Sequence, residues 1–256
     1  PRETASVRIG EIMPIFRFLA PWLLALFCTA SQAAQTLVIN SSYYPPFTTP
    51  EQNGFIDRLY QELGRRTGLT FKIQPLPAER ALSNANSGID DGDVCRIAGL
   101  DKTYPNLVQA PEPILSYKMK VFSRSVDFTV NGADSLKPYD VGILTGWKII
   151  ERTVVGTLSL SSVETVDQLI KMLQNKKVDI IVIEEMQGRA MMAKMGANNL
   201  KILEPALIEG QWYPYLNKKH ADLIAPITAA IRSMKQDGTY QKIYAETITR
   251  FTTIGR

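Results

Sequence analysis

Short apolar runs alternate with helix-spaced apolar residues along the first part of the chain. The runs predict strands at residues 37–39, 71–76 and 94–98. Apolar residues at helical spacing predict helices at residues 55–68 and 78–88, each ending at a glycine that tolerates the left-handed conformation of a helix terminus. The order strand, helix, strand, helix, strand predicts a parallel sheet with helices on its faces, because parallel neighbours need a crossover of about a dozen residues.

A second unit of the same kind follows. Residues 117–122 alternate apolar and polar side chains, which predicts a half-exposed strand that leaves the first unit. The later predicted strands lie at residues 141–144, 178–183 and 200–203, and a short helix is predicted at 148–155. A further helix follows the capping-box pattern of residues 161–164, and its apolar face consists of Val163, Val166, Leu169, Ile170 and Leu173. Two closing helices are predicted at 223–234 and 240–247. Residues 123–135 lack the composition of a flexible linker, so we expect a connection within a compact chain.

The composition is that of a globular protein, and it shortens the list of functions. The chain has 256 residues, of which 45% are apolar and 21% charged. Its two cysteines exclude a disulfide framework, and its single histidine argues against Cys/His zinc sites and histidine-based catalysis. The net charge of +4 has no basic run behind it, so we expect no nucleic-acid partner.

The N-terminus has the pattern of a secretory signal peptide. Arg17 precedes an apolar run at residues 18–27, and residues 31–33 offer the small side chains that a signal peptidase requires. The run is shorter than the roughly 20 apolar residues of a membrane helix. We therefore expect residues 1–33 to hold upstream sequence and a cleaved signal peptide, and the mature protein to be periplasmic. Cys95 is the single cysteine left after cleavage, and we expect it to be a buried apolar residue.

An aromatic loop follows the first predicted strand. It consists of Tyr43, Tyr44 and Phe47 around two prolines. Because open α/β sheets bind ligands at the carboxyl ends of their parallel strands, this segment is a candidate ligand-binding loop. The alternative is a packing loop whose prolines only end the strand.

Charged residues at two other strand ends are candidates for ligand recognition. Arg96 lies on or just beyond the third strand, where an enclosed guanidinium needs an anionic partner. That partner is either a ligand carboxylate or a neighbouring aspartate, and the residues alone favour the aspartate. Glu184 and Glu185 end the strand at 178–183, where a carboxylate can receive an ammonium group, act in acid/base catalysis or face solvent. Because consecutive strand residues face opposite sides, we expect Glu184 to recognise charge and Glu185 to face solvent.

Several motifs occur along the chain in a characteristic order. They are Tyr44-Pro45-Pro46-Phe47, Gly54-Phe55-Ile56-Asp57, Arg66-Thr67-Gly68-Leu69, Val178-Asp179-Ile180-Ile181-Val182-Ile183-Glu184 and the tail from Met234 to Tyr244. In this order they resemble the bacterial extracellular solute-binding proteins of the polar-amino-acid type (family 3), which are the periplasmic receptors of ABC importers. The match covers nearly the whole chain after the signal peptide.

The resemblance implies a two-lobed α/β fold, the type II periplasmic-binding-protein fold, in which each lobe is a mostly parallel sheet flanked by helices. Two hinge crossings would join the lobes, near residues 121–126 and 211–216. Lobe 1 would comprise residues 34–122 plus 213–256, and lobe 2 residues 123–212.

The resemblance also implies roles for individual side chains. The aromatic residues Tyr43, Tyr44 and Phe47 would stack on the ligand. An arginine of lobe 1 would hold its α-carboxylate, and Glu184 would take its α-ammonium group. Trp147 stands in a turn that is glycine-rich in the family, so it would narrow the cleft or add a stacking wall.

The arginine itself departs from the pattern of the family. Members usually carry Thr-x-x-Arg after the third strand, whereas residues 99–106 contain no arginine. Arg96 is the nearest replacement, with Arg80 as the alternative.

We therefore expect a periplasmic solute-binding protein that captures a small polar, amino-acid-like ligand between two closing lobes and delivers it to the membrane permease of an ABC importer. We expect a monomer without catalytic residues, cofactor or metal. One alternative is an enzyme on the same fold, similar to cyclohexadienyl dehydratases, with Glu184, Glu185 and Arg96 as candidate residues. The other is a ligand-sensing module that docks on a membrane receptor.

Overall fold

The computed structural model describes residue 2 and residues 35–249. The predicted signal peptide lies outside the described residues. Within residues 35–249, no helix has both the length and the apolar character needed to cross a membrane.

Three parallel strands and two crossover helices build the first sheet, as the sequence predicts. They are β1 (Thr36–Ser41), α1 (Phe55–Thr67), β2 (Thr70–Pro75), α2 (Ala78–Ser87) and β3 (Gly92–Arg96). β1 pairs in parallel with β2 on one side and with β3 on the other. Each helix ends at a left-handed glycine, Gly68 with φ 72° and Gly88 with φ 79°, because a residue without Cβ adopts this conformation readily.

A second sheet has the same construction of strands and helices. Its elements are β5 (Leu115–Ser123), η1 (Ala133–Leu136), β6 (Asp140–Leu144), α3 (Lys148–Thr153), β7 (Ser159–Val163), α4 (Val166–Gln174), β8 (Ile180–Glu184) and α5 (Glu185–Met195). β6 pairs in parallel with β7 and β8, and β5 pairs antiparallel with β8. Every residue of β8 is buried, as expected for a strand that is covered on both faces.

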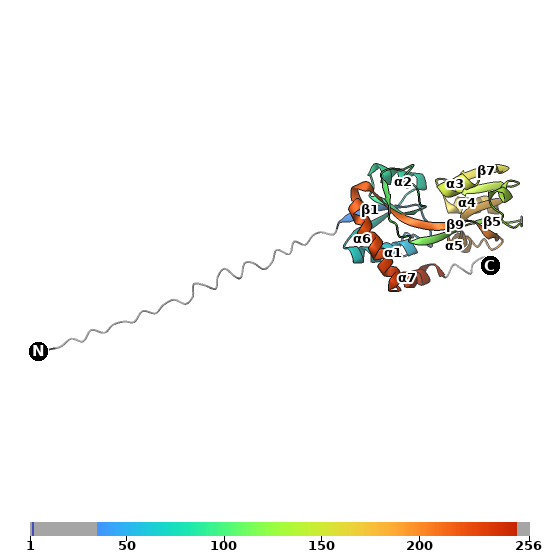
Figure 1. Ribbon diagram of the computed structural model, residues 1–256. Helices are drawn as coiled ribbons and strands as arrows, with labels where there is room; N and C mark the ends of the chain where they lie inside the picture. The colour runs from blue at the N-terminus through green and yellow to red at the C-terminus, as the bar shows by residue number, and fades with distance from the viewer. Residues whose placement is uncertain (1, 3–34, 250–256) are drawn as a thin grey trace. The chain divides into compact units, whose positions relative to one another are not determined.

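One long strand, β9 (Lys201–Asn217), joins the two sheets (Figure 1). Up to Trp212 it pairs with β5, whereas Tyr213 pairs with Arg96 of β3 and the last residues pair with the short strand β4 (Leu107–Gln109). The strand order is β2-β1-β3-β9-β5-β8-β6-β7. The second crossing that the sequence predicts, at residues 211–216, therefore lies within β9.

The first crossing occurs earlier than the expected residues 121–126. In the described chain, residues 115–123 pair with β8 and β9 alone, so they already belong to the second sheet. The chain thus passes from the first sheet to the second between β4 and β5, at residues 110–114. The division of the residues into two lobes stays a prediction, and this pairing favours a boundary before residue 115.

The region around Val163 also differs from the prediction. Residues 159–163 form the edge strand β7 instead of the start of a helix, and Val163 pairs with Leu144. The capping box lies later, where the Thr165 hydroxyl accepts a hydrogen bond from the N–H of Gln168 (3.3 Å) and the Gln168 side chain accepts one from the N–H of Thr165 (3.1 Å). The sequence before Thr165 imitates a capping box, but parallel pairing with β6 decides its structure, as is common for residues of mixed propensity.

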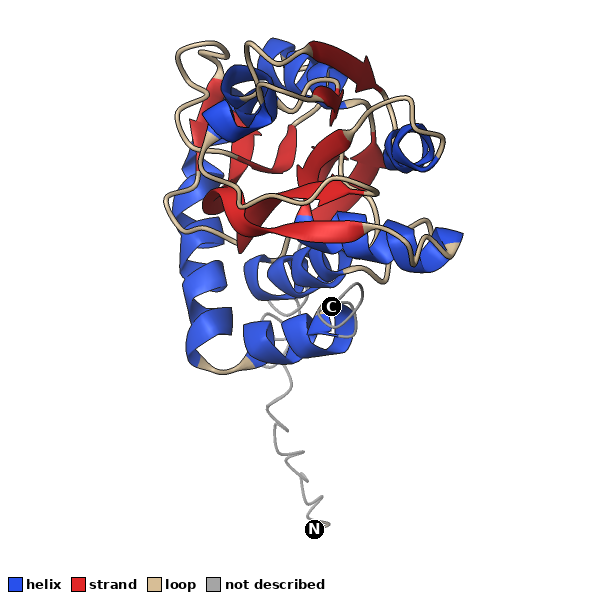
Figure 2. Cartoon of the chain, turned by 90° about the vertical axis from the view of Figure 1, so that its right-hand side faces the viewer, coloured by secondary structure: helices blue, strands red, loops and turns tan. Residues whose placement is uncertain are grey.

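Two helices close the described chain. After η2 (Lys218–Leu223), both α6 (Ile224–Gln236) and α7 (Thr239–Thr247) pack against α1, so the chain returns to the first sheet. Phe55 of α1 meets the rings of Tyr240 and Tyr244 edge-on, with centroids 5.5 Å and 5.7 Å away. Figure 2 shows helices lying around the strands, an arrangement that buries the apolar faces of the sheets. Each aliphatic side chain buried in this way contributes roughly 1.5–3 kcal/mol to folding.

Candidate functional site

A cavity lies where the two sheets meet, at the carboxyl ends of β1 and β3 and beside the turn between β6 and α3. It is lined by residues from both sheets, namely Tyr43, Leu82, Arg96, Ile97, Leu100, Met119, Gly146, Trp147, Lys148, Ile149 and Trp212. This is the position at which open α/β sheets bind ligands. The room between the side chains is about 30 Å³, which is the space of roughly one water molecule. A solute of amino-acid size therefore enters only when the two sides move apart.

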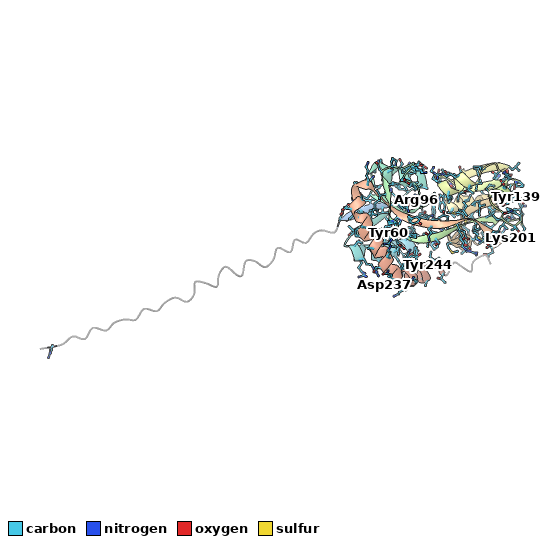
Figure 3. The ribbon with its side chains drawn as sticks, viewed as in Figure 1. Tyr60, Arg96, Tyr139, Lys201, Asp237 and Tyr244 are labelled. Atoms are coloured by element: carbon cyan, nitrogen blue, oxygen red, sulfur yellow. The ribbon has the colours of Figure 1, made fainter. Side chains whose placement is uncertain are left out.

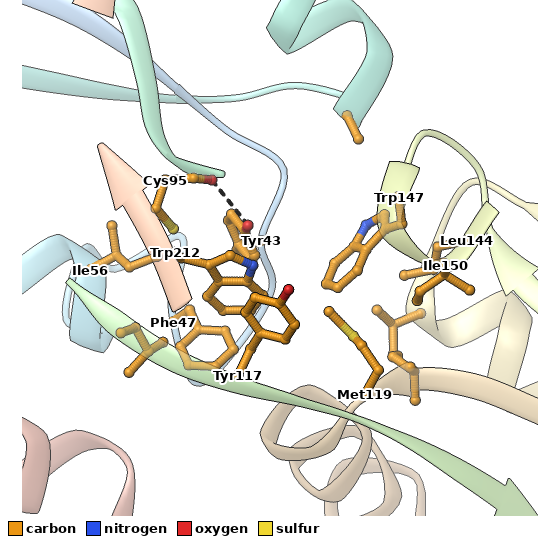
Figure 4. Packing of buried hydrophobic residues seen from close by; sticks show 14 of the residues in the cluster. Tyr43, Phe47, Ile56, Cys95, Tyr117, Met119, Leu144, Trp147, Ile150 and Trp212 are labelled. Carbon is orange, nitrogen blue, oxygen red and sulfur yellow. Dashed lines mark hydrogen bonds between the residues drawn. The ribbon is translucent and has the colours of Figure 1, made fainter. Parts of the chain in front are cut away.

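Three aromatic rings form a wall of the cavity (Figure 4). The centroid of the Tyr43 ring lies 4.6 Å from that of Trp212 and 5.7 Å from that of Trp147, and the two indoles are 6.3 Å apart. The Tyr43 hydroxyl donates a hydrogen bond to the carbonyl oxygen of Cys95 (3.0 Å), and Trp212 stacks on Tyr117 at 5.1 Å. Burial raises the pKa of Tyr43 well above its usual range, so the hydroxyl stays protonated. Since Tyr43 follows β1 and Trp147 follows β6, the rings meet across the cavity.

Arg96 places a buried positive charge at the cavity (Figure 3). It is the last residue of β3 and is 7% exposed. Its Nη2 donates to Oδ2 of Asp93 (2.7 Å) and to the carbonyl oxygen of Ala78 (3.4 Å), so the aspartate pairing that the sequence favours is present. Although burial disfavours the charge, attraction by the Asp93 carboxylate raises the pKa of Arg96 further above its usual range. Within residues 35–249 the buried Nε has no hydrogen-bond acceptor.

Lys148 supplies a second positive charge. Its Nζ lies 2.5 Å from Oε2 of Glu79 on α2 and 3.3 Å from Oε2 of Glu151. The hydrogen bond between Lys148 and Glu79 raises the pKa of Lys148 and lowers that of Glu79. Glu79 also accepts a hydrogen bond from the Tyr104 hydroxyl (2.8 Å), and Glu151 accepts one from the N–H of Gly146 (2.6 Å). These contacts hold the β6–α3 turn against α2 at the edge of the cavity.

The cavity contains Tyr43, Arg96 and Trp147, but not the other residues predicted for ligand binding. Phe47 is 1% exposed and packs edge-on against Trp212, with ring centroids 5.5 Å apart, so it supports the aromatic wall from the core. Arg80 is exposed on α2 and does not line the cavity.

Tyr44 borders a different hollow. This second cavity measures about 420 Å³, and Pro50, Asp57 and Lys194 are among the other residues that line it. The backbone N–H of Tyr44 donates to Oε1 of Gln187 on α5 (3.1 Å). Tyr44 therefore connects the loop after β1 with the second sheet and does not belong to the wall beside Arg96.

Glu184 also lies away from the cavity at Arg96. It is the last residue of β8, and its Oε2 accepts a hydrogen bond from the N–H of Gln187 (2.9 Å), which caps α5. Burial raises the pKa of Glu184 to about 8. The residue lines a separate pocket together with Tyr117 and Tyr244. The structure thus does not bring Glu184 and Arg96 to one cavity.

The expectation that Glu185 faces solvent is wrong. α5 begins at Glu185, so the alternation of strand side chains ends one residue earlier. Its carboxylate pairs with Arg189 one helical turn later (2.7 Å), and the side chain is only 14% exposed.

Sequence reasoning did not predict the other lining residues, among them Trp212 and Lys148. Trp212 comes from β9, and a single tryptophan in a predicted crossing carries no pattern that points to a site. Lys148 follows Trp147 at the start of a predicted helix, and that position next to a candidate residue was the available signal.

Comparisons with known proteins bear on the fold. No protein-family model matches the chain. An uncharacterized protein of Shewanella oneidensis is 24% identical over 191 residues, which is 72% of this chain and 72% of that protein. The solved structure of the substrate-binding protein of an amino acid ABC transporter matches with a TM-score of 0.69 and 17% identity, over 83% of this chain and 98% of that chain. A histidine kinase sensor domain with similarity to periplasmic binding proteins matches with a TM-score of 0.73 and 18% identity, over 85% of this chain and 97% of that chain.

These matches define the class of fold. The chain has the type II periplasmic-binding-protein fold, in which two sheets flanked by helices are joined by two crossings, so the predicted fold class is confirmed. The resemblance to solute-binding proteins of the polar-amino-acid type is confirmed at the level of the fold.

Proposed function

We propose that this chain is a periplasmic solute-binding protein that captures a small carboxylate-bearing solute between two lobes and delivers it to the permease of an ABC importer. The observation that carries the proposal is Arg96, a buried guanidinium at an aromatic cavity whose Nε has no acceptor in the described chain. The fold supports the proposal, because the chain shares it with the substrate-binding protein of an amino acid ABC transporter.

Arg96 is suited to hold a carboxylate. A buried donor without an acceptor costs about 1–3 kcal/mol, and a carboxylate oxygen at Nε would remove this penalty. The hydrogen bond to Asp93 keeps the guanidinium charged and fixes its orientation. A fixed, charged guanidinium is the group that binds carboxylates most specifically.

The aromatic wall would hold the rest of the solute. Tyr43 and Trp147 come from the two sides of the cavity, so a solute that contacts both does so only when the sides are close together. Solute groups shared between lobes stabilise the closed state alone, which is how capture is coupled to closure. We place the hinge at residues 110–114 and within β9. The chain before the first crossing and the chain after the second then form lobe 1, and the segment between the two crossings forms lobe 2.

The solute itself provides the central test. Native mass spectrometry of protein purified without added solute should detect a bound small carboxylic acid. Titration calorimetry then measures its affinity, and small-angle scattering at saturation should show a smaller radius of gyration than the protein alone. Equal radii in the two states would contradict capture by closure.

Delivery and location need tests of their own. Fractionation of cells that produce the full chain should find a shortened monomeric protein in the periplasm, and loss of the chain should abolish uptake of its solute. Uptake that continues without the chain would favour the sensing module. Formation of product from prephenate or arogenate would identify the enzyme on this fold instead.

A further inference from the structure

We propose that the solute is an organic acid with an apolar body and without a charged α-ammonium group. This inference rests on the proposed function, and it narrows the class of solute that the cavity at Arg96 would hold. It departs from the amino-acid-like ligand that the sequence resemblance implies.

The charged groups that line the cavity have one sign. They are Arg96 and Lys148, and no carboxylate within residues 35–249 lines it with them. The nearby acids are engaged by these same cations: Asp93 pairs with Arg96, and Glu79 and Glu151 pair with Lys148. An ammonium group that entered the cavity would meet two cations and no carboxylate, and a buried charge without a counter-charge is strongly unfavourable.

Glu184, to which the resemblance assigns the ammonium group, is used elsewhere. Its carboxyl caps α5 through the N–H of Gln187 and borders the separate pocket of Tyr117 and Tyr244. Burial favours the neutral form of this carboxyl and so raises its pKa. A neutral carboxyl in another pocket gives an ammonium group at Arg96 no compensation.

Aromatic rings can bind a cation in place of a carboxylate, but the rings of this cavity already have partners. The guanidinium carbon of Arg96 lies 6.0 Å from the centre of the Tyr43 ring. The same ring packs against Trp212 and Trp147 at 4.6 Å and 5.7 Å. A second cation here would be repelled by Arg96, so the cavity disfavours quaternary ammonium compounds as well as amino acids.

The remaining walls suit an apolar body. Besides the three rings, the aliphatic side chains that line the cavity are Leu82, Ile97, Leu100, Met119 and Ile149. Apolar groups of a solute gain by leaving water for such walls. A carboxylate at Arg96 with a ring or branched chain packed against the aromatic wall therefore matches both the charge and the lining of the cavity.

Matched probes that differ only in the ammonium group test this inference. Titration calorimetry near neutral pH compares hydrocinnamate with L-phenylalanine and isocaproate with L-leucine, and phenethylamine serves as a cation without a carboxylate. We expect the deaminated acid of at least one pair to bind at least about tenfold more tightly than its amino acid, and phenethylamine not to bind. An amino acid that binds as tightly as its deaminated partner, or more tightly, overturns the inference and leaves the proposed function standing.

Glu184→Gln separates the two possible sites. If an ammonium group bound at Glu184, the substitution would weaken the amino acids and spare the deaminated acids. We expect it to leave every affinity within about twofold of the unsubstituted protein.

Native mass spectrometry decides the case in which no probe binds. A copurified acid without an ammonium group supports the inference. A copurified amino acid overturns the inference but leaves the proposed function standing. Purified protein that carries no acid and binds no probe contradicts the proposed function together with the inference.

Discussion

Lys148 on α3 and Glu79 on α2 form an ion pair across the edge of the cavity, with Nζ 2.5 Å from Oε2. The two helices flank different sheets, so the pair exists only while the two sides of the cavity are close together. The hydrogen bond from the Tyr44 N–H to Gln187 has the same property. The protein's own polar contacts therefore favour closure, in addition to the contacts that a solute would make.

Replacing Glu79 by glutamine should shift the protein without solute toward an open arrangement. A partly exposed ion pair contributes about 0.2–1 kcal/mol, and the Glu79 side chain is 53% exposed, so we expect the ratio of closed to open protein to fall by at most about fivefold. Small-angle scattering without solute should show a larger radius of gyration than for the unsubstituted protein. Lys171→Gln, which breaks an ion pair with Asp167 inside α4, is the matched control, and an equal change there would contradict the assignment.

Arg96→Lys should weaken solute binding by at least about tenfold, because it keeps the charge and loses the planar fork that holds a carboxylate. Lysine also leaves Asp93 with a cationic partner, so the buried carboxylate is not stranded. Titration calorimetry measures the affinity, and thermal unfolding verifies that the variant is folded. Arg80→Lys on the exposed face of α2 is the control, and a loss confined to that control would move the carboxylate site to Arg80.

Glu184 should make the stability of the protein depend on pH. Burial raises its pKa to about 8 in the folded state, whereas a glutamate in an unfolded chain titrates near about 4.3. Between these values the folded state keeps a proton that the unfolded state has released, so the free energy of unfolding falls as the pH rises. The stabilising contribution of this proton is complete below about pH 4.3 and is lost as the pH passes about 8.

Glu184→Gln should remove this dependence, since a glutamine does not titrate and can still cap α5. Between about pH 5 and about pH 9, we expect urea unfolding to show the original protein losing on the order of 4 kcal/mol more than the variant. Glu209→Gln, whose side chain borders the same pocket but is 60% exposed, should follow the original protein. Parallel pH profiles for the original protein and Glu184→Gln would mean that the carboxyl is not buried as described.

Local signals in the sequence predict much of the fold. α2 spans residues 78–87 as predicted, because Gly88 supplies the left-handed terminus that stops the helix. The prediction fails where two local patterns compete: the residues before Thr165 imitate a helix start, and only pairing with β6 makes them a strand. The prediction that Glu185 faces solvent fails for a related reason, since β8 passes directly into α5 with no glycine or proline to mark the change.

The cavity is predictable in part, because some of its residues stand at strand ends and others arrive from a distance. Tyr43 and Trp147 each follow a strand and Arg96 ends one, and these are positions that sequence reasoning can examine. Trp212 reaches the same place only because β9 pairs with β5 and brings it opposite Leu115. Long-range pairing of this kind leaves no mark on the residues next to Trp212 in the sequence.

Gly146 should be a position at which one added methyl group prevents closure. Its φ is 81°, and a Cβ there would lie 2.9 Å from the Cβ of Ala78 and 2.9 Å from the backbone N of Glu79. Gly146→Ala therefore combines left-handed strain of about 1–2 kcal/mol with a clash that exists only while α2 and the β6–α3 turn are in contact. We expect solute affinity to fall by at least about tenfold, and the radius of gyration at high solute concentration to stay that of the open protein.

Gly238→Ala is the matched control for this substitution, because Gly238 has a similar φ of 83° and, its chain neighbours apart, no atom of the described chain lies within 4 Å of a Cβ built there. Both variants should lose similar thermal stability through the shared strain, so any difference in affinity reports the clash alone. Since Gly146 and Ala78 stand on opposite sides of the cavity, that difference measures whether solute binding requires the two sides to meet. Equal solute affinities in the two variants would show that the turn moves aside freely, and that a solute is held without contact between α2 and the turn.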